Sequence, residues 1–255
     1  MTVVNSPSPG WVELANGAVS LRCWWARPQI RGNEIESILY LKRAYIVLPE
    51  VFGVNAWVRS VADRLAAQGY PALAVPLFAR TAPDLELSYE PSDLAQGRSH
   101  KDATTAAQIL SDVAVAIAWV RQRCPQAAIH VVGFCFGGHA AFLAATLPGV
   151  EQAFDFYGAG VNRMRPGGGE PSLNLLPEVK AGLTCVFGTA DPLISAEDRE
   201  AIGEALRKAD PAGQRLRFVE YAGADHGFMC EARNSFHPLA SAQGWRLLLA
   251  EDPGI

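Results

Sequence analysis

Cys135 stands between two glycines in the stretch Gly133-Phe134-Cys135-Phe136-Gly137, after an apolar run and before an alanine-rich one. A strand that ends in Gly-x-nucleophile-x-Gly and turns at once into a helix holds its central side chain out of the sheet, ready to attack. The flanking glycines are needed because the turn is sharp and strained. The N-terminus of the helix that follows favours the thiolate, which is the nucleophilic form of cysteine. The spacing therefore predicts a nucleophilic Cys135, and the alternative is a small cysteine buried in the core.

Such a nucleophile needs a general base and an acid that orients the base, and in this arrangement they follow it in the order acid, base. Asp191 follows the apolar run of "LTCVFGTADPLI", and His226 follows that of "RLRFVEYAGADHGF". None of the other four histidines is placed in this way after a late strand. The bland alternatives are a turn-forming aspartate before Pro192 and a histidine in a glycine-rich loop. Asp225, which adjoins His226, is a weaker rival for the acid.

The elements that must position these residues alternate along the chain. Two apolar segments around Asn16-Gly17 predict a hairpin, because Asn-Gly between such segments is a strong turn signal. Apolar strands and helical patterns then alternate to the end, which predicts an α/β fold with a mostly parallel central sheet and helices on both faces. In such sheets the chemistry lies beyond the carboxyl ends of the strands. The polar segments 81–102 and 162–174 are expected to be surface loops, the first with room for a helical turn.

The 255 residues and their composition fit one domain that spans residues 1–255. The net charge is −4, and no basic face for a nucleic acid is evident. The apolar runs are too short to span a membrane, and the N-terminus has no secretion signal. The five cysteines are scattered without a C-x-x-C pair, so we expect a cytoplasmic chain with free thiols and no metal site. A monomer or weak dimer without a cofactor is expected.

Five motifs together carry a resemblance to a known family: "LPEVFGVN", "PLFAR", "GFCFGG", "FGTADPLI" and "DHGF". Their order and approximate spacing resemble those of the dienelactone hydrolase family of the α/β-hydrolase superfamily, from about residue 12 to about residue 250. The resemblance implies an α/β-hydrolase fold and a Cys-His-Asp triad made of Cys135, His226 and Asp191. It also implies a strand-end glutamate, Glu50, that interacts with the thiol in the resting enzyme.

The resemblance implies further site residues. The oxyanion hole would use the backbone N–H groups of Val51 and Phe136, and Arg80 would hold the carboxylate of the substrate. The family has a second carboxylate-binding arginine four residues after the catalytic histidine, and here that position is Cys230. Cys230 would then be a neutral wall of the substrate pocket or a buried loop thiol. Arg233, three residues further on, is a candidate to replace the missing arginine.

The sequence thus predicts a hydrolase that cleaves a small ester or lactone through an acyl-thioester on Cys135. Two alternatives stay open. One is a general carboxylesterase or thioesterase without a preference for acidic substrates. The other is a non-catalytic, hydrolase-like protein that binds a ligand or another chain.

Overall fold

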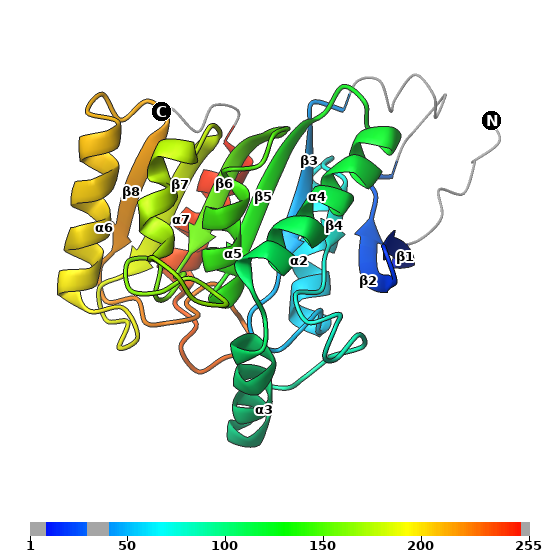
Figure 1. Ribbon diagram of the computed structural model, residues 1–255, viewed down its shortest axis with the longest axis horizontal. Helices are drawn as coiled ribbons and strands as arrows, with labels where there is room; N and C mark the ends of the chain where they lie inside the picture. Colours follow the sequence, from blue (N-terminus) through cyan, green and yellow to red (C-terminus); the bar gives the residue numbers. More distant parts are fainter. Residues whose placement is uncertain (1–8, 30–40, 251–255) are drawn as a thin grey trace.

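A computed structural model describes residues 9–29 and 41–250 of the chain. Its centre is an eight-stranded sheet in the order β1-β2-β4-β3-β5-β6-β7-β8, which crosses Figure 1 from right to left. The strands are β1 (Gly10–Asn16), β2 (Val19–Ala26), β3 (Arg43–Leu48), β4 (Ala72–Ala74), β5 (Ala128–Phe134), β6 (Val150–Phe156), β7 (Gly182–Gly188) and β8 (Leu216–Tyr221).

The first two strands form the hairpin that the Asn16-Gly17 pair predicts. Asn16 pairs with Val19 at its closed end, and Gly17 adopts the left-handed φ of 61° that the turn requires. β2 joins β4 in antiparallel fashion, and all pairs from β4 through β3 to β8 are parallel. The prediction of a mostly parallel sheet is confirmed. The carboxyl ends of β3, β5, β7 and β8 therefore meet at one edge.

Helices cover both faces of this sheet (Figure 1): α4, α5 and α6 lie on the near face, and α2 and α7 lie behind. Their bounds are α2 (Ala56–Ala67), α3 (Pro91–Asp102), α4 (Ala106–Arg123), α5 (Phe136–Ala144), α6 (Ala196–Ala209) and α7 (Pro238–Leu249), with a 3₁₀ helix η1 (Ser172–Glu178). The strands β3, β5 and β7 are almost wholly buried, as expected for parallel strands covered on both sides.

The polar segment 81–102 differs from the expected loop, because its second half is the twelve-residue helix α3. Pro91 occupies the first turn, where its missing N–H costs nothing. Only Gly97 of this helix is buried, so the sequence lacks the apolar stripe by which an amphipathic helix is recognised. Figure 1 shows α3 projecting below the sheet, beyond the strand ends that carry the candidate site residues.

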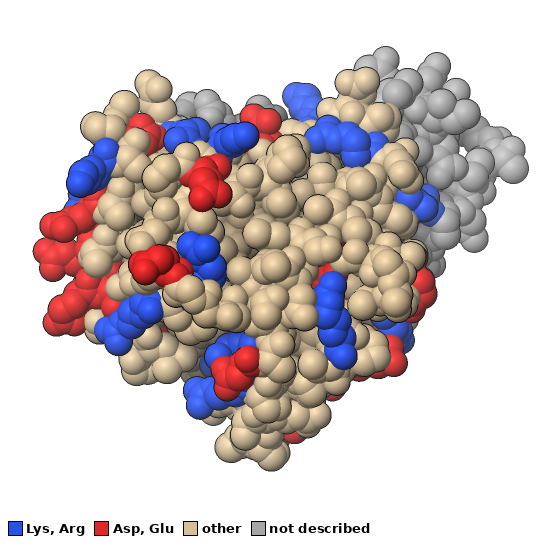
Figure 2. All heavy atoms as spheres, viewed as in Figure 1, with Lys and Arg blue, Asp and Glu red and all other residues tan. Residues whose placement is uncertain are grey.

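Charges of both signs are mixed over the face drawn in Figure 2, and acidic side chains gather at the edge formed by α6. Within the described ranges, no single helix has the length and apolar composition to cross a membrane. The helices α3 and α4 pass that test only when they are counted together, across a bend of 93°.

Candidate active site

Cys135 lies at the junction of β5 and α5 with φ 55° and ψ −118°, a left-handed conformation that is uncommon for a residue other than glycine. A Cβ at Gly133 would lie 1.7 Å from the carbonyl oxygen of Gly137, and a Cβ at Gly137 would lie 2.2 Å from that of Leu48. Both glycines are therefore required by close backbone packing. The N–H of Cys135 donates to Phe156 O at 3.0 Å. The turn thus fixes the backbone of Cys135, whose side chain is partly exposed.

His226 and Asp191 meet at the same edge of the sheet. Nδ1 of His226 donates to Oδ2 of Asp191 at 2.8 Å, and both side chains are buried. The other carboxylate oxygen of Asp191 accepts from the N–H of Leu193 at 2.8 Å. This pairing leaves Nε2 for the substrate side; Nε2 has no hydrogen bond of standard geometry among the described residues, and the ring lies near the thiol of Cys135. The acid therefore orients the imidazole as a general base requires.

The charge of Cys135 acts directly on His226. Burial by itself lowers the pKa of His226, but a negative charge on Cys135 and the hydrogen bond to Asp191 outweigh it and raise the pKa to about 10. The imidazole of His226 therefore favours its cationic form. The structure thus brings together the three residues that the sequence predicted as a triad.

Val51 and Phe136 both line the pocket that contains Cys135 and His226. Phe136 is the first residue of α5, so its N–H has no intrahelical acceptor. Within the described part of the chain, neither this N–H nor that of Val51 donates to a backbone carbonyl. An oxyanion hole needs two uncommitted donors of this kind.

Glu50, at the end of β3, is 1 % exposed and pairs with Arg233. Its Oε1 accepts from Nη1 of Arg233 at 2.7 Å, and Oε2 lacks a hydrogen bond of standard geometry. The hydroxyl of Tyr89 lies near this carboxylate. Burial raises the pKa of Glu50, and the positive charges of Arg233 and His226 oppose that effect. No hydrogen bond between Glu50 and Cys135 occurs among the residues described. Arg233 therefore holds the carboxylate that the resemblance assigned to the thiol.

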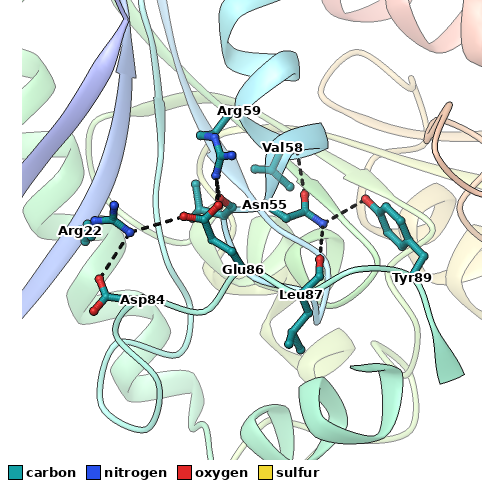
Figure 3. A network of polar contacts seen from close by, with 9 residues as sticks. Arg22, Asn55, Val58, Arg59, Asp84, Glu86, Leu87 and Tyr89 are labelled. Carbon is teal, nitrogen blue, oxygen red and sulfur yellow. Dashed lines mark hydrogen bonds and ion pairs between the residues drawn. The ribbon is translucent and has the colours of Figure 1, made fainter. Parts of the chain in front are cut away.

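Tyr89 lies near Glu50. The loop that carries Tyr89 is anchored to Asn55 at the start of α2 (Figure 3). Asn55 caps α2 by accepting from Val58 N, and its amide nitrogen donates to Leu87 O at 3.1 Å and to the Tyr89 hydroxyl at 3.2 Å. The same loop carries acidic side chains that pair with arginines of β2 and α2, as Figure 3 shows: Arg22 with Asp84 and Glu86, and Arg59 with Glu86.

The pocket above Cys135 has a volume of about 150 Å³. Its lining comprises Val51, Phe52, Leu94, Arg98, Lys101, Cys135, Phe136, Ala159, Leu193, His226 and Arg233. Sequence reasoning missed the three residues that α3 contributes. Their spacing of i, i+4 and i+7 along Leu94, Arg98 and Lys101 places them on one helical face, and this is the signal that could have found them.

Arg80 lies outside the pocket that contains Cys135. Its guanidinium makes two hydrogen bonds to Asp112 of α4, Nη1 to Oδ2 at 2.6 Å and Nη2 to Oδ1 at 3.0 Å, and it is absent from the pocket lining. The Asp112 side chain is 1 % exposed, and a buried carboxylate needs such a partner. Asn16 of the hairpin also donates to it. The carboxylate that Arg80 binds is thus the protein's own, and a substrate-binding role for Arg80 does not fit this placement.

Cys230 is fully buried and is also absent from the pocket lining. Its thiol lies near Glu50 and Tyr89, and burial followed by the charge of Glu50 raises its pKa to about 12. It packs behind the site as a neutral thiol, as the buried-loop alternative predicted. Arg233, the suggested replacement for the missing arginine, does line the pocket.

No group of three or more His, Cys, Asp or Glu side chains in the described ranges is arranged to hold a metal ion.

Several known proteins are similar to this chain. The family model of the dienelactone hydrolase family matches residues 39–250. A Synechocystis protein provisionally named carboxymethylenebutenolidase is 39 % identical over 204 residues, which are 79 % of this chain and 81 % of the relative. The carboxymethylenebutenolidase of Pseudomonas putida is 30 % identical over 77 % of this chain and 79 % of its own. A crystal structure from Klebsiella pneumoniae, provisionally assigned as a dienelactone hydrolase, superposes with a TM-score of 0.82 at 25 % identity and covers 98 % of this chain and 100 % of its own. The chain belongs to the dienelactone hydrolase family of ester hydrolases with the α/β-hydrolase fold.

Proposed function

We propose that the protein hydrolyses a small ester or lactone that carries an acidic group, with Cys135 as nucleophile. The observation that carries this proposal is the meeting of Cys135, the Asp191-oriented imidazole of His226 and two uncommitted N–H donors in one pocket. The names of the relatives from Synechocystis and Pseudomonas putida support a lactone or ester as substrate.

In the acylation step the sulfur of Cys135 attacks the acyl carbon, and a C–S bond forms. The negative charge that develops on the acyl oxygen is stabilised by the N–H groups of Val51 and Phe136. The C–O bond to the leaving group then breaks, and the proton on Nε2 of His226 passes to the leaving alkoxide. In a lactone the leaving hydroxyl stays attached to the acyl group.

Deacylation reverses these roles. Nε2 of His226 takes a proton from water, the resulting hydroxide adds to the thioester carbon, and the C–S bond breaks. The products are the carboxylic acid and the thiolate of Cys135, which again faces the imidazolium. Asp191 holds the ring in the required tautomer throughout.

The cations of the pocket support an acidic substrate, Arg98 above all, because Arg233 is paired with Glu50 and Lys101 with Asp102. Arg98 and Lys101 reach the pocket from α3 and Arg233 from the loop after β8, and all three line the same cavity. Glu50 lies beneath the pocket and holds Arg233 in place. We assign to these cations the carboxylate recognition that the resemblance placed on Arg80.

Alkylation of the thiols tests the triad without any assumption about the substrate. Only Cys135 is partly exposed among the five cysteines, and burial raises the pKa of each of the others. Exposure alone would thus favour Cys135, so the informative comparison is with His226→Gln. We expect iodoacetamide to label Cys135 at pH 6.5 at least about tenfold more slowly in that variant. Equal rates would support the non-catalytic alternative.

Paired substrates test the acidic preference. Arg98→Ala should lower kcat/KM for an ester with a free carboxylate by about tenfold, because a charge-assisted hydrogen bond contributes about 1.5–3 kcal/mol before solvent screening. A neutral ester of the same size should be affected by less than about twofold. Arg207→Ala, which removes an exposed arginine from α6, is the matched control. Equal losses for both esters would favour a general carboxylesterase or thioesterase.

A further inference from the structure

Asp155 is a fully buried carboxylate on β6 that the proposed reaction does not use. It lies between Gly133 of β5 and Cys185 of β7 in the sheet register. A carboxylate in such a place is costly unless it is hydrogen-bonded. A structural or functional role is therefore expected for the Asp155 carboxylate.

The carboxylate binds the turn that follows its own strand. Oδ1 accepts from the N–H of Gly158 at 2.8 Å, the thiol of Cys185 lies beside it, and Oδ2 has no partner among the described residues. A Cβ at Gly158 would lie 2.2 Å from Oδ1, and a Cβ at Gly138 in the first turn of α5 would lie 2.5 Å from it. Asp155 thus fills the space between this turn and the helix that starts after Cys135.

The turn forces Tyr157 into a left-handed conformation with φ 44°, which is unfavourable for a bulky side chain. The N–H of Tyr157 donates to Val186 O at 2.8 Å, so the strained residue is tied to β7 on one side and enclosed by the Asp155 hydrogen bond on the other. Its ring packs edge-on against the ring of His226, with centroids 5.2 Å apart and an interplanar angle of 64°. The ring of Tyr157 therefore packs directly against the catalytic imidazole.

We propose that Asp155 is a positioning residue for the reaction: its Oδ1 holds the Tyr157 turn, and the Tyr157 ring holds His226 at the angle that lets Nε2 serve Cys135. The inference rests on the proposed function. Asp191 fixes one nitrogen of the imidazole, and the Tyr157 ring limits how far the imidazole can rotate about that hydrogen bond. A small misplacement of a catalytic group lowers the rate strongly, because proton transfer depends on alignment.

The property to be preserved is the acceptor oxygen rather than the charge. Burial raises the pKa of Asp155 to about 7, against the opposing hydrogen bond from Gly158, so the uncharged form is populated at neutral pH. Asp155→Asn keeps an oxygen for Gly158, and Asp155→Ala removes it. Gln152→Ala is the matched control, because Gln152 is another buried polar residue of β6 with a hydrogen bond to Thr184.

Steady-state kinetics on one activated ester and the alkylation rate of Cys135 at pH 6.5 are measured for each variant. We expect Asp155→Asn and Gln152→Ala to stay within about threefold of the unmodified protein. Asp155→Ala should lower kcat by at least about tenfold with KM within about twofold, and alkylation should slow in parallel. In a Tyr157→Ala background the effect of Asp155→Ala should vanish, because Asp155 acts on His226 only through Tyr157.

Unchanged kcat in Asp155→Ala, equal losses in the Asn and Ala variants, or additive losses with Tyr157→Ala would each overturn the inference. Should Asp155→Ala fail to fold, Tyr157→Ala alone must reproduce the loss of kcat and of alkylation, and normal values in that variant would also overturn it. The alkylation arm separates the two proposals. If no ester is cleaved but alkylation follows the expected order, the hydrolytic proposal fails and the positioning of His226 by Asp155 stands.

Discussion

Replacing Arg233 breaks its ion pair with Glu50, and the burial of the two side chains determines the cost in stability. Glu50 is 1 % exposed, and the side chain of Arg233 is 21 % exposed. Arg233→Met keeps most of the apolar volume and removes the charge. Removing one partner of a buried ion pair leaves the other uncompensated, at a cost of about 3–5 kcal/mol. For a chain of this size that cost corresponds to a fall in Tm of roughly 10 °C.

The pH dependence identifies Glu50 as the cause. Burial raises the pKa of Glu50 and Arg233 lowers it, so the variant raises it further. A carboxyl with a raised folded-state pKa binds more protons in the folded protein than in the unfolded one. The free energy of unfolding therefore falls by up to about 1.4 kcal/mol per pH unit above the ordinary carboxyl pKa of about 4.3, until the folded-state pKa is reached. The stability of the variant should thus be close to that of the unmodified protein near pH 4 and should fall below it toward pH 8.

Thermal unfolding from pH 4 to pH 8 measures this difference, with Glu50→Gln/Arg233→Met as control. The double variant has no ionisable group at position 50, so its Tm difference from the unmodified protein should vary less with pH than that of the single variant. Identical pH profiles of the single and double variants would refute the reasoning, because Glu50 would then not be the uncompensated charge.

Three further outcomes are expected. Asp191→Asn should lower kcat by about 10²–10⁴-fold with little change in KM, since the amide favours the wrong tautomer of His226, and steady-state kinetics decide this; a loss below about threefold would contradict it. Gly97→Ala would place a Cβ 2.3 Å from Val51 O, so α3 or the backbone at Val51 must shift. A shift of α3 should raise KM for an acidic ester more than KM for a neutral ester, and an equal rise for both would contradict a displacement of the α3 cations. Because the pKa of His226 is raised to about 10, its pairing stabilises the fold fully below the ordinary value near 6.5 and progressively less up to about pH 10. The stability gap to His226→Gln, measured by chemical denaturation, should shrink over that range, and a gap that widens would contradict the pairing.

Local sequence determined the turn around Cys135 and the succession of strands and helices. The turn could be predicted because its glycines are required by backbone contacts within a few residues, such as the contact of Gly133 with Gly137. The placement of Asp191 and His226 followed from strand order, because the carboxyl ends of parallel strands share one edge.

Only the tertiary structure decided which charged side chains pair. Arg233 binds Glu50 across 183 residues, and Arg80 binds Asp112 rather than facing the pocket. The helix α3, which supplies Arg98 and Lys101, has no apolar stripe from which the sequence could predict it. Buried charges take whichever partner the folded chain brings within reach, and that choice depends on contacts between distant segments rather than on any local pattern.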